Sequence, residues 1–199
     1  MIKRLFDIAC AGLGLLVLSP LLLALALWIK LDSQGPVMFR QERVGRFGNL
    51  FFIHKFRTMR VDNAGPQITV GADPRITAAG ALLRKTKLDE LPQLWDVLRG
   101  AMSLVGPRPE VPRYVALYSP AQRELVLSVR PGITDLASLQ YRDEGEQLAR
   151  AADPERAYVE QVMPAKLALS TRYVQEASFV GDLRLILATV AALFHRVGR

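Results

Sequence analysis

The longest apolar segment of the chain lies at its N-terminus. No charged residue occurs from Ile8 to Ile29, and Lys30 closes the run. A helix of this length is long enough to span a lipid bilayer. Ser19 and Pro20 stand in the middle of the segment, where a proline removes a backbone hydrogen bond and kinks or breaks a helix at a cost of about 3 kcal/mol. The pattern therefore predicts a membrane-associated helical segment that is interrupted near its centre.

Three interpretations of this segment remain open from the pattern alone. A cleaved signal peptide is indicated by the basic start and by Ala24-Leu25-Ala26, although the apolar run continues past that point. A straight transmembrane helix has the required length. A re-entrant helix–break–helix enters the membrane and returns to the same side, and the Ser19 hydroxyl can satisfy backbone groups that the break sets free. Basic residues flank the segment at both ends, which favours placing both ends in the cytoplasm: Lys3, Arg4, Lys30, Arg40, Arg43 and Arg46.

The pattern beyond residue 34 predicts a small α/β domain that is mostly α. Short apolar runs at 37–39 and 51–53, with a turn between them, predict a β-hairpin. Thr77 is a suitable N-cap for a helix that carries Ala81, Leu82 and Leu83. Longer helical patterns follow at 111–129, at 153–175 with an interruption near Pro164, and at 179–194. The last of these is apolar enough to pack into a core or to lie on a membrane surface.

Two carboxylates stand side by side in Lys87-Leu88-Asp89-Glu90-Leu91-Pro92. Apolar residues follow at helical spacing, Asp89 is a suitable N-cap, and Pro92 is tolerated in a first turn, so this stretch predicts the start of a short helix. The free N–H groups and the dipole at such a position favour ionised carboxylates. An ionised aspartate can attack phosphorus or hold a divalent cation. An acidic helix start without any chemistry explains the same pattern.

Cationic side chains recur in the segments around this pair. Lys55 and Arg57 alternate with apolar residues and are expected on one face of a strand. Arg84 lies in a basic segment just before Asp89, and two prolines fix the backbone around Arg108. Together these cations suit phosphate binding. Each alone is also typical of a solvated strand face, a helix C-terminus or an exposed turn.

Composition narrows the choice of partners. The net charge is +7, from 26 Lys and Arg against 19 Asp and Glu, and the mean hydropathy is +0.16. A basic surface beside an apolar segment favours anionic lipid headgroups or phosphorylated substrates. The few aromatic residues are not interleaved with basic runs, so nucleic acid is not expected as a partner. The single Cys10 excludes a disulfide within the chain, and with two histidines a zinc site is not expected.

Several short motifs, in their joint order and spacing, resemble the bacterial sugar transferases, which are small monotopic polyprenol-phosphate phosphoglycosyl transferases. The motifs are Ser19-Pro20, Lys55-Phe56-Arg57-Thr58-Met59, Leu88-Asp89-Glu90-Leu91-Pro92-Gln93-Leu94, Ser103-Leu104-Val105-Gly106-Pro107-Arg108-Pro109 and Arg130-Pro131-Gly132-Ile133-Thr134. The resemblance runs from Lys3-Arg4-Leu5-Phe6-Asp7 to about Phe194, nearly the whole chain. It departs after Thr134, where many members continue with Gly-Trp-Ala-Gln and this chain has Asp135-Leu136-Ala137-Ser138. The candidates for substrate contact after this departure are Gln140 and Arg142.

The resemblance implies a reaction. A sugar-1-phosphate would pass from a UDP-sugar to undecaprenyl phosphate with release of UMP, as the first membrane step in assembling a polysaccharide or a glycoprotein glycan. Asp89 would attack the β-phosphate and carry a covalent phosphosugar, and Glu90 would assist proton transfer or position the groups. Mg²⁺ bound near Asp89 would offset the charge of the pyrophosphate. The positions expected to line the phosphate site are Lys55, Arg57, Arg84 and Arg108.

The resemblance also implies a location and a domain organisation. Residues 1–34 would form a re-entrant anchor that breaks at Ser19-Pro20, and residues 35–199 a catalytic domain with helices along the membrane interface. The protein would be monotopic in the bacterial inner membrane, with its active site facing the cytoplasm. UDP-sugar, undecaprenyl phosphate and membrane lipid are the expected partners, and downstream glycosyltransferases and a second copy of the chain are further candidates. The rival hypothesis is a non-catalytic basic scaffold, anchored to the membrane, that binds anionic lipid or nucleic acid.

Overall fold

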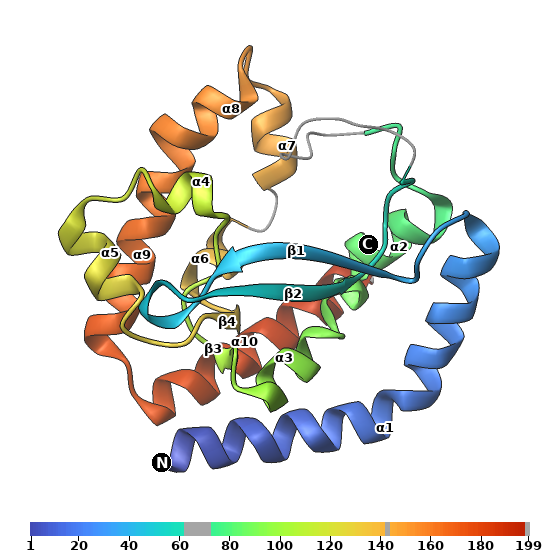
Figure 1. Ribbon diagram of the computed structural model, residues 1–199, viewed down its shortest axis with the longest axis horizontal. Helices are drawn as coiled ribbons and strands as arrows, with labels where there is room; N and C mark the ends of the chain where they lie inside the picture. The colour runs from blue at the N-terminus through green and yellow to red at the C-terminus, as the bar shows by residue number, and fades with distance from the viewer. Residues whose placement is uncertain (62–72, 142–143, 198–199) are drawn as a thin grey trace.

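The computed structural model describes residues 1–61, 73–141 and 144–197. Its elements form a mostly helical α/β fold in which a two-stranded hairpin crosses the middle of the molecule (Figure 1). The helices are α1 (Ile2–Asp32), α2 (Ala78–Thr86), α3 (Gln93–Arg99), α4 (Pro112–Val115), α5 (Pro120–Val126), α6 (Leu136–Gln140), α7 (Glu144–Ala149), α8 (Pro154–Ala157), α9 (Met163–Glu176) and α10 (Phe179–Val197). The strands are β1 (Met38–Val44), β2 (Leu50–Phe56), β3 (Ser103–Val105) and β4 (Gly132–Thr134).

The N-terminal apolar segment is one bent helix. Helix α1 runs along the bottom of the molecule and then turns up along its right side (Figure 1). Pro20 is the proline inside α1, and prolines are the usual cause of a sharp kink. The Ser19 hydroxyl donates to the carbonyl of Leu16 (2.7 Å), as its predicted role requires. The predicted break is thus a bend within a continuous helix, because the backbone stays helical through Ser19 and Pro20.

Much of α1 is exposed. Its buried residues are Asp7, Ala11, Leu25 and Ile29, while large apolar side chains such as Leu16 stay exposed. By length and composition, α1 is able to cross a membrane. Its contacts with the rest of the chain come from both halves. Ala11 packs with Val97 and Met102, and Leu25 and Ile29 pack with Phe56 and Leu83.

The predicted hairpin is present and is longer than the apolar runs suggested. Strands β1 and β2 pair antiparallel, with Phe39 opposite Lys55, and a 3₁₀ turn at Arg46–Gly48 joins them. Thr77 caps α2 as expected, because its side chain accepts from the Gly80 N–H. Strand β2 packs against α3, so the hairpin is fixed on the element that follows the two carboxylates.

A second pair of strands was not predicted. Strands β3 and β4 pair in parallel and join the Ser103–Pro109 and Arg130–Thr134 motifs. Their backbones cross so closely that a Cβ on Gly132 would lie 2.1 Å from the Gly106 nitrogen. Real Cβ atoms do not approach that near, so this crossing requires glycine.

One helical prediction needs correction, and a second is confirmed. The pattern at 111–129 is two short helices, α4 and α5, because Ser119 forms a capping box and Pro120 starts a new helix. The pattern at 153–175 is irregular near Pro164, as predicted, although Pro164 itself sits in the first turn of α9, where its missing N–H does no harm. The irregularity precedes it, as a π-helical turn at Tyr158–Val162.

Candidate active site

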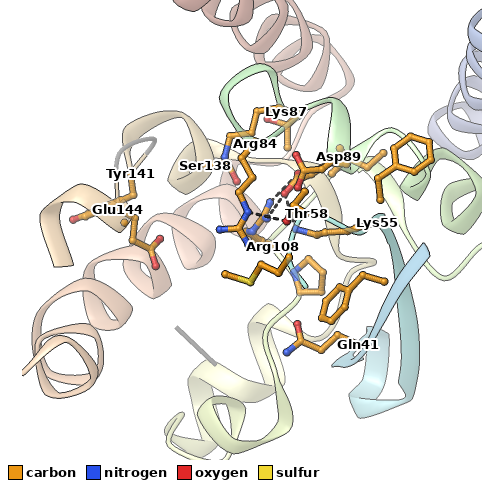
Figure 2. Close-up of a pocket in the computed structure, with 18 of the residues that line it drawn as sticks. Gln41, Lys55, Thr58, Arg84, Lys87, Asp89, Arg108, Ser138, Tyr141 and Glu144 are labelled. Carbon is orange, nitrogen blue, oxygen red and sulfur yellow. Dashed lines mark hydrogen bonds and ion pairs between the residues drawn. The ribbon is translucent and has the colours of Figure 1, made fainter. Parts of the chain in front are cut away.

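A cavity of about 1250 Å³ lies beside the two carboxylates. The hairpin, α2, the turn at Leu88–Glu90, the loop after β3, α6 and α10 all contribute to its wall. Figure 2 shows Asp89 at one side, with Lys55, Arg84 and Arg108 near it and with Tyr141 and Glu144 on the opposite wall. Segments distant in the sequence therefore bring most of the predicted cations to the predicted acidic pair.

The local backbone around the pair differs from the prediction. Helix α2 ends at Lys87, which has the left-handed φ of 59°, and a 3₁₀ turn at Leu88–Glu90 follows. Helix α3 begins at Gln93, with Pro92 as its N-cap. The prediction that Asp89 caps this helix is therefore wrong. The tight turn, rather than a helix N-terminus, places the two carboxylates in the cavity wall.

Glu90 is held by two cations. Lys55 Nζ donates to Glu90 Oε1 (2.7 Å), and Arg108 donates through Nη2 to Oε1 (2.5 Å) and through Nη1 to Oε2 (3.3 Å). Burial alone would raise the pKa of Glu90, but Arg108 and Lys55 outweigh it and hold the pKa well below its usual range. Glu90 is consequently an ionised carboxylate that orients both cations.

Asp89 has the opposite environment. Burial, and next the charge of Glu90, raise the pKa of Asp89, while Lys55, Lys87 and Arg84 act against this shift. Within the described part of the chain, Asp89 Oδ1 is buried and has no hydrogen-bond partner. A buried oxygen without a partner is costly unless a ligand satisfies it. Asp89 is therefore the group of this pair that is open to a substrate or a cation.

Arg84 and Arg108 reach the cavity from rigid segments. Arg84 Nε donates to the Thr58 hydroxyl (2.8 Å), which fixes the side chain in the cavity wall near Asp89 (Figure 2). Arg108 follows the close crossing of β3 and β4, and its backbone N–H donates to Asp135 Oδ2 (3.3 Å). Fixed guanidinium groups beside a carboxylate suit the binding of a phosphate.

Three residues that were predicted to contact the substrate are not placed in the cavity as Lys55, Arg84 and Arg108 are. Arg57 is 3% exposed, and its guanidinium donates to the carbonyls of Ser33, Gln34 and Pro36 just after α1. Its chain borders the cavity, but these carbonyls engage its donors, so the phosphate contact by Arg57 stays a prediction that this geometry does not favour. Gln140 is exposed and lies outside the cavity wall, so its predicted contact is also not supported. Arg142 lies outside the described residues.

Other wall residues were not selected from the sequence. Thr58 orients Arg84, although its motif was noted for its cations. Lys87, which belongs to the basic segment that was noted before Asp89, acts on the pKa of Asp89. Ser138 Oγ is buried without a hydrogen-bond partner in the described part of the chain, and Glu144 forms an ion pair with Lys166 (2.8 Å) on the far wall. No local pattern indicated Ser138 or Glu144, because they reach the cavity through tertiary packing.

The donor set fits a magnesium ion only with help from a substrate. Across residues 1–61, 73–141 and 144–197, no cluster of three or more His, Cys, Asp or Glu is able to form a metal cage. Mg²⁺ often binds through one or two carboxylates, with substrate phosphates and water completing its octahedron. The unsatisfied Asp89 Oδ1 is such a ligand, whereas Glu90 is engaged by Lys55 and Arg108.

Comparison with known proteins decides the family. The family model described as "Bacterial sugar transferase" matches residues 1–196. The chain belongs to this family. An exopolysaccharide production protein, PSS, of Rhizobium leguminosarum bv. phaseoli is 42% identical over 98% of this chain and 96% of its own length. A UDP-glucose:undecaprenyl-phosphate glucose-1-phosphate transferase of Caulobacter vibrioides is 39% identical over 96% of this chain and 69% of that protein.

A relative with the same name in Escherichia coli is 37% identical, and the match covers 96% of this chain but 39% of the longer protein. The present chain thus spans about two fifths of the length of that protein. Membership in the bacterial sugar transferase family makes the chain an enzyme. The rival hypothesis of a non-catalytic scaffold is therefore not retained.

Proposed function

We propose that this sugar transferase moves a sugar-1-phosphate from a UDP-sugar to undecaprenyl phosphate through a covalent intermediate on Asp89. One observation carries the proposal. Asp89 presents a buried carboxylate oxygen, without a hydrogen-bond partner among the described residues, to a cavity lined by Lys55, Arg84 and Arg108. The relatives named as undecaprenyl-phosphate glucose-1-phosphate transferases support the choice of donor and acceptor classes.

In the first half-reaction, the pyrophosphate of the donor binds against Arg84, Lys55 and Arg108. An Asp89 oxygen attacks the β-phosphorus, an oxygen–phosphorus bond forms, and the bond from that phosphorus to the bridging oxygen breaks. UMP leaves with that oxygen and the electron pair. Since phosphoryl transfer depends mainly on alignment and charge stabilisation, positioned cations are the part the protein must supply.

In the second half-reaction, a phosphate oxygen of the polyprenyl phosphate attacks the same phosphorus. The bond to Asp89 breaks, the aspartate is regenerated, and the product is a polyprenyl diphosphate sugar. Glu90 contributes by position. Because the pKa of Glu90 lies well below its usual range, it stays ionised at neutral pH and orients Lys55 and Arg108. This supports its predicted positioning role over a role in proton transfer.

The proposal includes Mg²⁺. The residue that would hold it is Asp89, through Oδ1, together with phosphate oxygens of the substrate. The bound ion would supply neutralisation of the pyrophosphate charge. The cations of the chain share this task, since they surround the same carboxylate.

We further propose that α1 is a re-entrant anchor in residues 1–34 and that residues 35–199 form a catalytic domain on the cytoplasmic face of the inner membrane. Both ends of α1 are bound to one folded core: Arg4 donates to carbonyls at the end of α3, and Ile29 packs with Phe56. The ends of a straight spanning helix would lie about 30 Å apart on opposite sides of the bilayer. A core on one side would then reach only one of them, and the bend in Figure 1 avoids this conflict.

The reaction and the topology have separate tests. The variant Asp89→Asn should release no UMP from a UDP-sugar and should still associate with membranes, while normal turnover would refute the role of Asp89. Tags at Met1 and Arg199 should both be cytoplasmic. A periplasmic N-terminus, or cleavage after Ala26, would refute the re-entrant topology. Assaying the wild-type enzyme with a panel of UDP-sugars for UMP release identifies the donor.

A further inference from the structure

Three charged side chains lie in the first two turns of the otherwise apolar helix α1. Arg4 donates to the carbonyls of Val97 (2.7 Å) and Leu98 (3.0 Å). Asp7 is 3% exposed and accepts from the Ser103 hydroxyl (2.8 Å) and from the Leu104 N–H (3.3 Å). The third residue, Lys3, also forms hydrogen bonds with the folded core. None of the three is therefore only a solvent-facing charge at the end of a membrane segment.

Lys3 completes a cluster with the C-terminal helix. Its ammonium donates to the Val105 carbonyl (3.1 Å) and forms an ion pair with Asp182 at the start of α10. The Tyr173 hydroxyl donates to Asp182 Oδ1 (2.8 Å) and approaches the same Val105 carbonyl (3.2 Å). Asp182 is 4% exposed, so this is a largely buried network that joins α1, β3, α9 and α10.

The receiving groups belong to the segments that carry the active site. Val97 and Leu98 end α3, which begins directly after the turn of Asp89 and Glu90. Strand β3 leads within a few residues to Arg108. The charged start of α1 is therefore bonded to the backbone of both segments, although it lies outside the cavity wall.

Apolar packing alone would not fix α1 on the core. In lipid, an apolar helix gains little by exchanging lipid contacts for protein contacts, because the hydrophobic effect between helices is absent. Hydrogen bonds and ion pairs from Lys3, Arg4 and Asp7 have one geometry, so they are able to set how α1 docks. Because α1 is the segment that inserts into the membrane, the same bonds also set the depth and the tilt of the cavity relative to the membrane.

We infer that Lys3, Arg4 and Asp7 are positioning residues that set the height of the catalytic cavity relative to the membrane. They act on the step that uses the lipid acceptor, and they do not act on the reaction with the soluble donor. The inference rests on the proposed function, because it distinguishes the two half-reactions of that function. The local site is held together by its own contacts, such as those of Glu90 with Lys55 and Arg108.

The test compares Lys3→Ala and Asp7→Ala in the full chain, reconstituted in phospholipid vesicles that contain undecaprenyl phosphate. Exchange of labelled UMP into UDP-glucose, without acceptor, measures the first half-reaction. Formation of lipid-linked sugar measures the second. The matched control is Lys30→Ala, which removes a cation from the opposite end of α1, where Lys30 makes an exposed bond to the Gly35 carbonyl. The conservative variant Lys3→Arg keeps a donor for Asp182.

The expected result is a split between the two readouts. UMP exchange stays within about twofold of wild type, while lipid transfer falls roughly a hundredfold, the scale of loss for a misplacement of about an ångström. Lys3→Arg and Lys30→Ala retain lipid transfer. With a short, water-soluble prenyl phosphate in detergent solution, the Ala variants regain transfer, because no membrane plane then has to be matched.

Several results would overturn the inference: an equal fall of both half-reactions, no fall in either, or a loss that persists with the soluble acceptor. A readout independent of catalysis is the quenching of Trp95 by brominated lipids in a Trp28→Phe background, where Trp95 is the remaining tryptophan. Its depth profile should shift in Asp7→Ala and not in Lys30→Ala, and an unchanged profile would refute the inference. Absence of UMP exchange in the wild-type enzyme with every UDP-sugar tried would instead refute the proposed function.

Discussion

The two adjacent carboxylates should respond in opposite directions when each is made neutral. Glu90→Gln removes the anion that pairs with Lys55 and Arg108, both of which are largely buried. Breaking a buried ion pair typically costs about 3–5 kcal/mol. Since the Arg108 side chain keeps 32% exposure, the lower end, about 3 kcal/mol, is expected. Asp89→Asn instead removes a carboxylate whose ionisation is disfavoured, so the free energy of unfolding should stay unchanged or rise by about 1 kcal/mol.

Thermal unfolding in detergent, followed by circular dichroism, measures the contrast. For a chain of this size, 3 kcal/mol corresponds to a decrease in Tm of roughly 6–12 °C. The exposed Glu124 provides the control Glu124→Gln, which should leave Tm unchanged. If both active-site variants moved Tm in the same direction, or if Glu90→Gln had no effect, the assignment of opposite environments would be refuted.

The pH dependence of this contrast follows from the two shifts. The folded pKa of Glu90 is depressed, so its stabilisation is present above the unfolded pKa and is lost as the pH falls through the folded value. The folded pKa of Asp89 is raised, so its ionisation costs stability as the pH rises above the unfolded value. The difference in Tm between the two variants should therefore be large at neutral pH and should shrink in acid.

Three further predictions concern other parts of the molecule. Arg57→Met should lower the free energy of unfolding by roughly 3 kcal/mol, because it leaves the carbonyls after α1 without a hydrogen-bond donor, and it should leave the KM for the UDP-sugar unchanged. A large rise in KM without a change in Tm would show that Arg57 contacts the phosphate. Gly132→Ala should prevent accumulation of folded protein, because the added Cβ would lie 2.1 Å from the Gly106 nitrogen. The control Gly12→Ala should fold, because its added Cβ has its nearest contact at 3.8 Å, and equal yields of the two variants would contradict the close approach of the two backbones. An excess of chelator should stop UMP release, and activity that persisted would remove Mg²⁺ from the account.

The sequence predicted elements that depend on local patterns. The apolar runs at 37–39 and 51–53 predicted the hairpin, and the Thr77 cap predicted the start of α2, since both features follow from contacts between near neighbours. The pairing of β3 with β4 depends on residues such as Gly106 and Gly132, which are far apart in the chain. A three-residue strand has too short a pattern to be recognised alone.

In the candidate site, too, residue types could be predicted from local motifs, whereas properties that depend on tertiary packing could not. Asp89 and Lys55 could be selected by residue type and motif. The directions of their pKa shifts depend first on burial, which no local pattern reveals. Arg57 matched the same pattern as Lys55, yet its guanidinium binds the backbone after α1. Strand β2 ends at Phe56, so Arg57 lies just beyond it, and the segment that follows α1 decides where its side chain is bound.

The central claim, a covalent intermediate on Asp89, has a direct measurement. The purified enzyme is incubated with UDP-glucose, or with whichever UDP-sugar supports UMP release, in the absence of acceptor, and its intact mass and peptides are determined. Wild type should gain the mass of one sugar phosphate on the peptide that contains Asp89, undecaprenyl phosphate should remove this mass, and Asp89→Asn should never acquire it. Turnover without an adduct, or an adduct on another residue, would contradict the account.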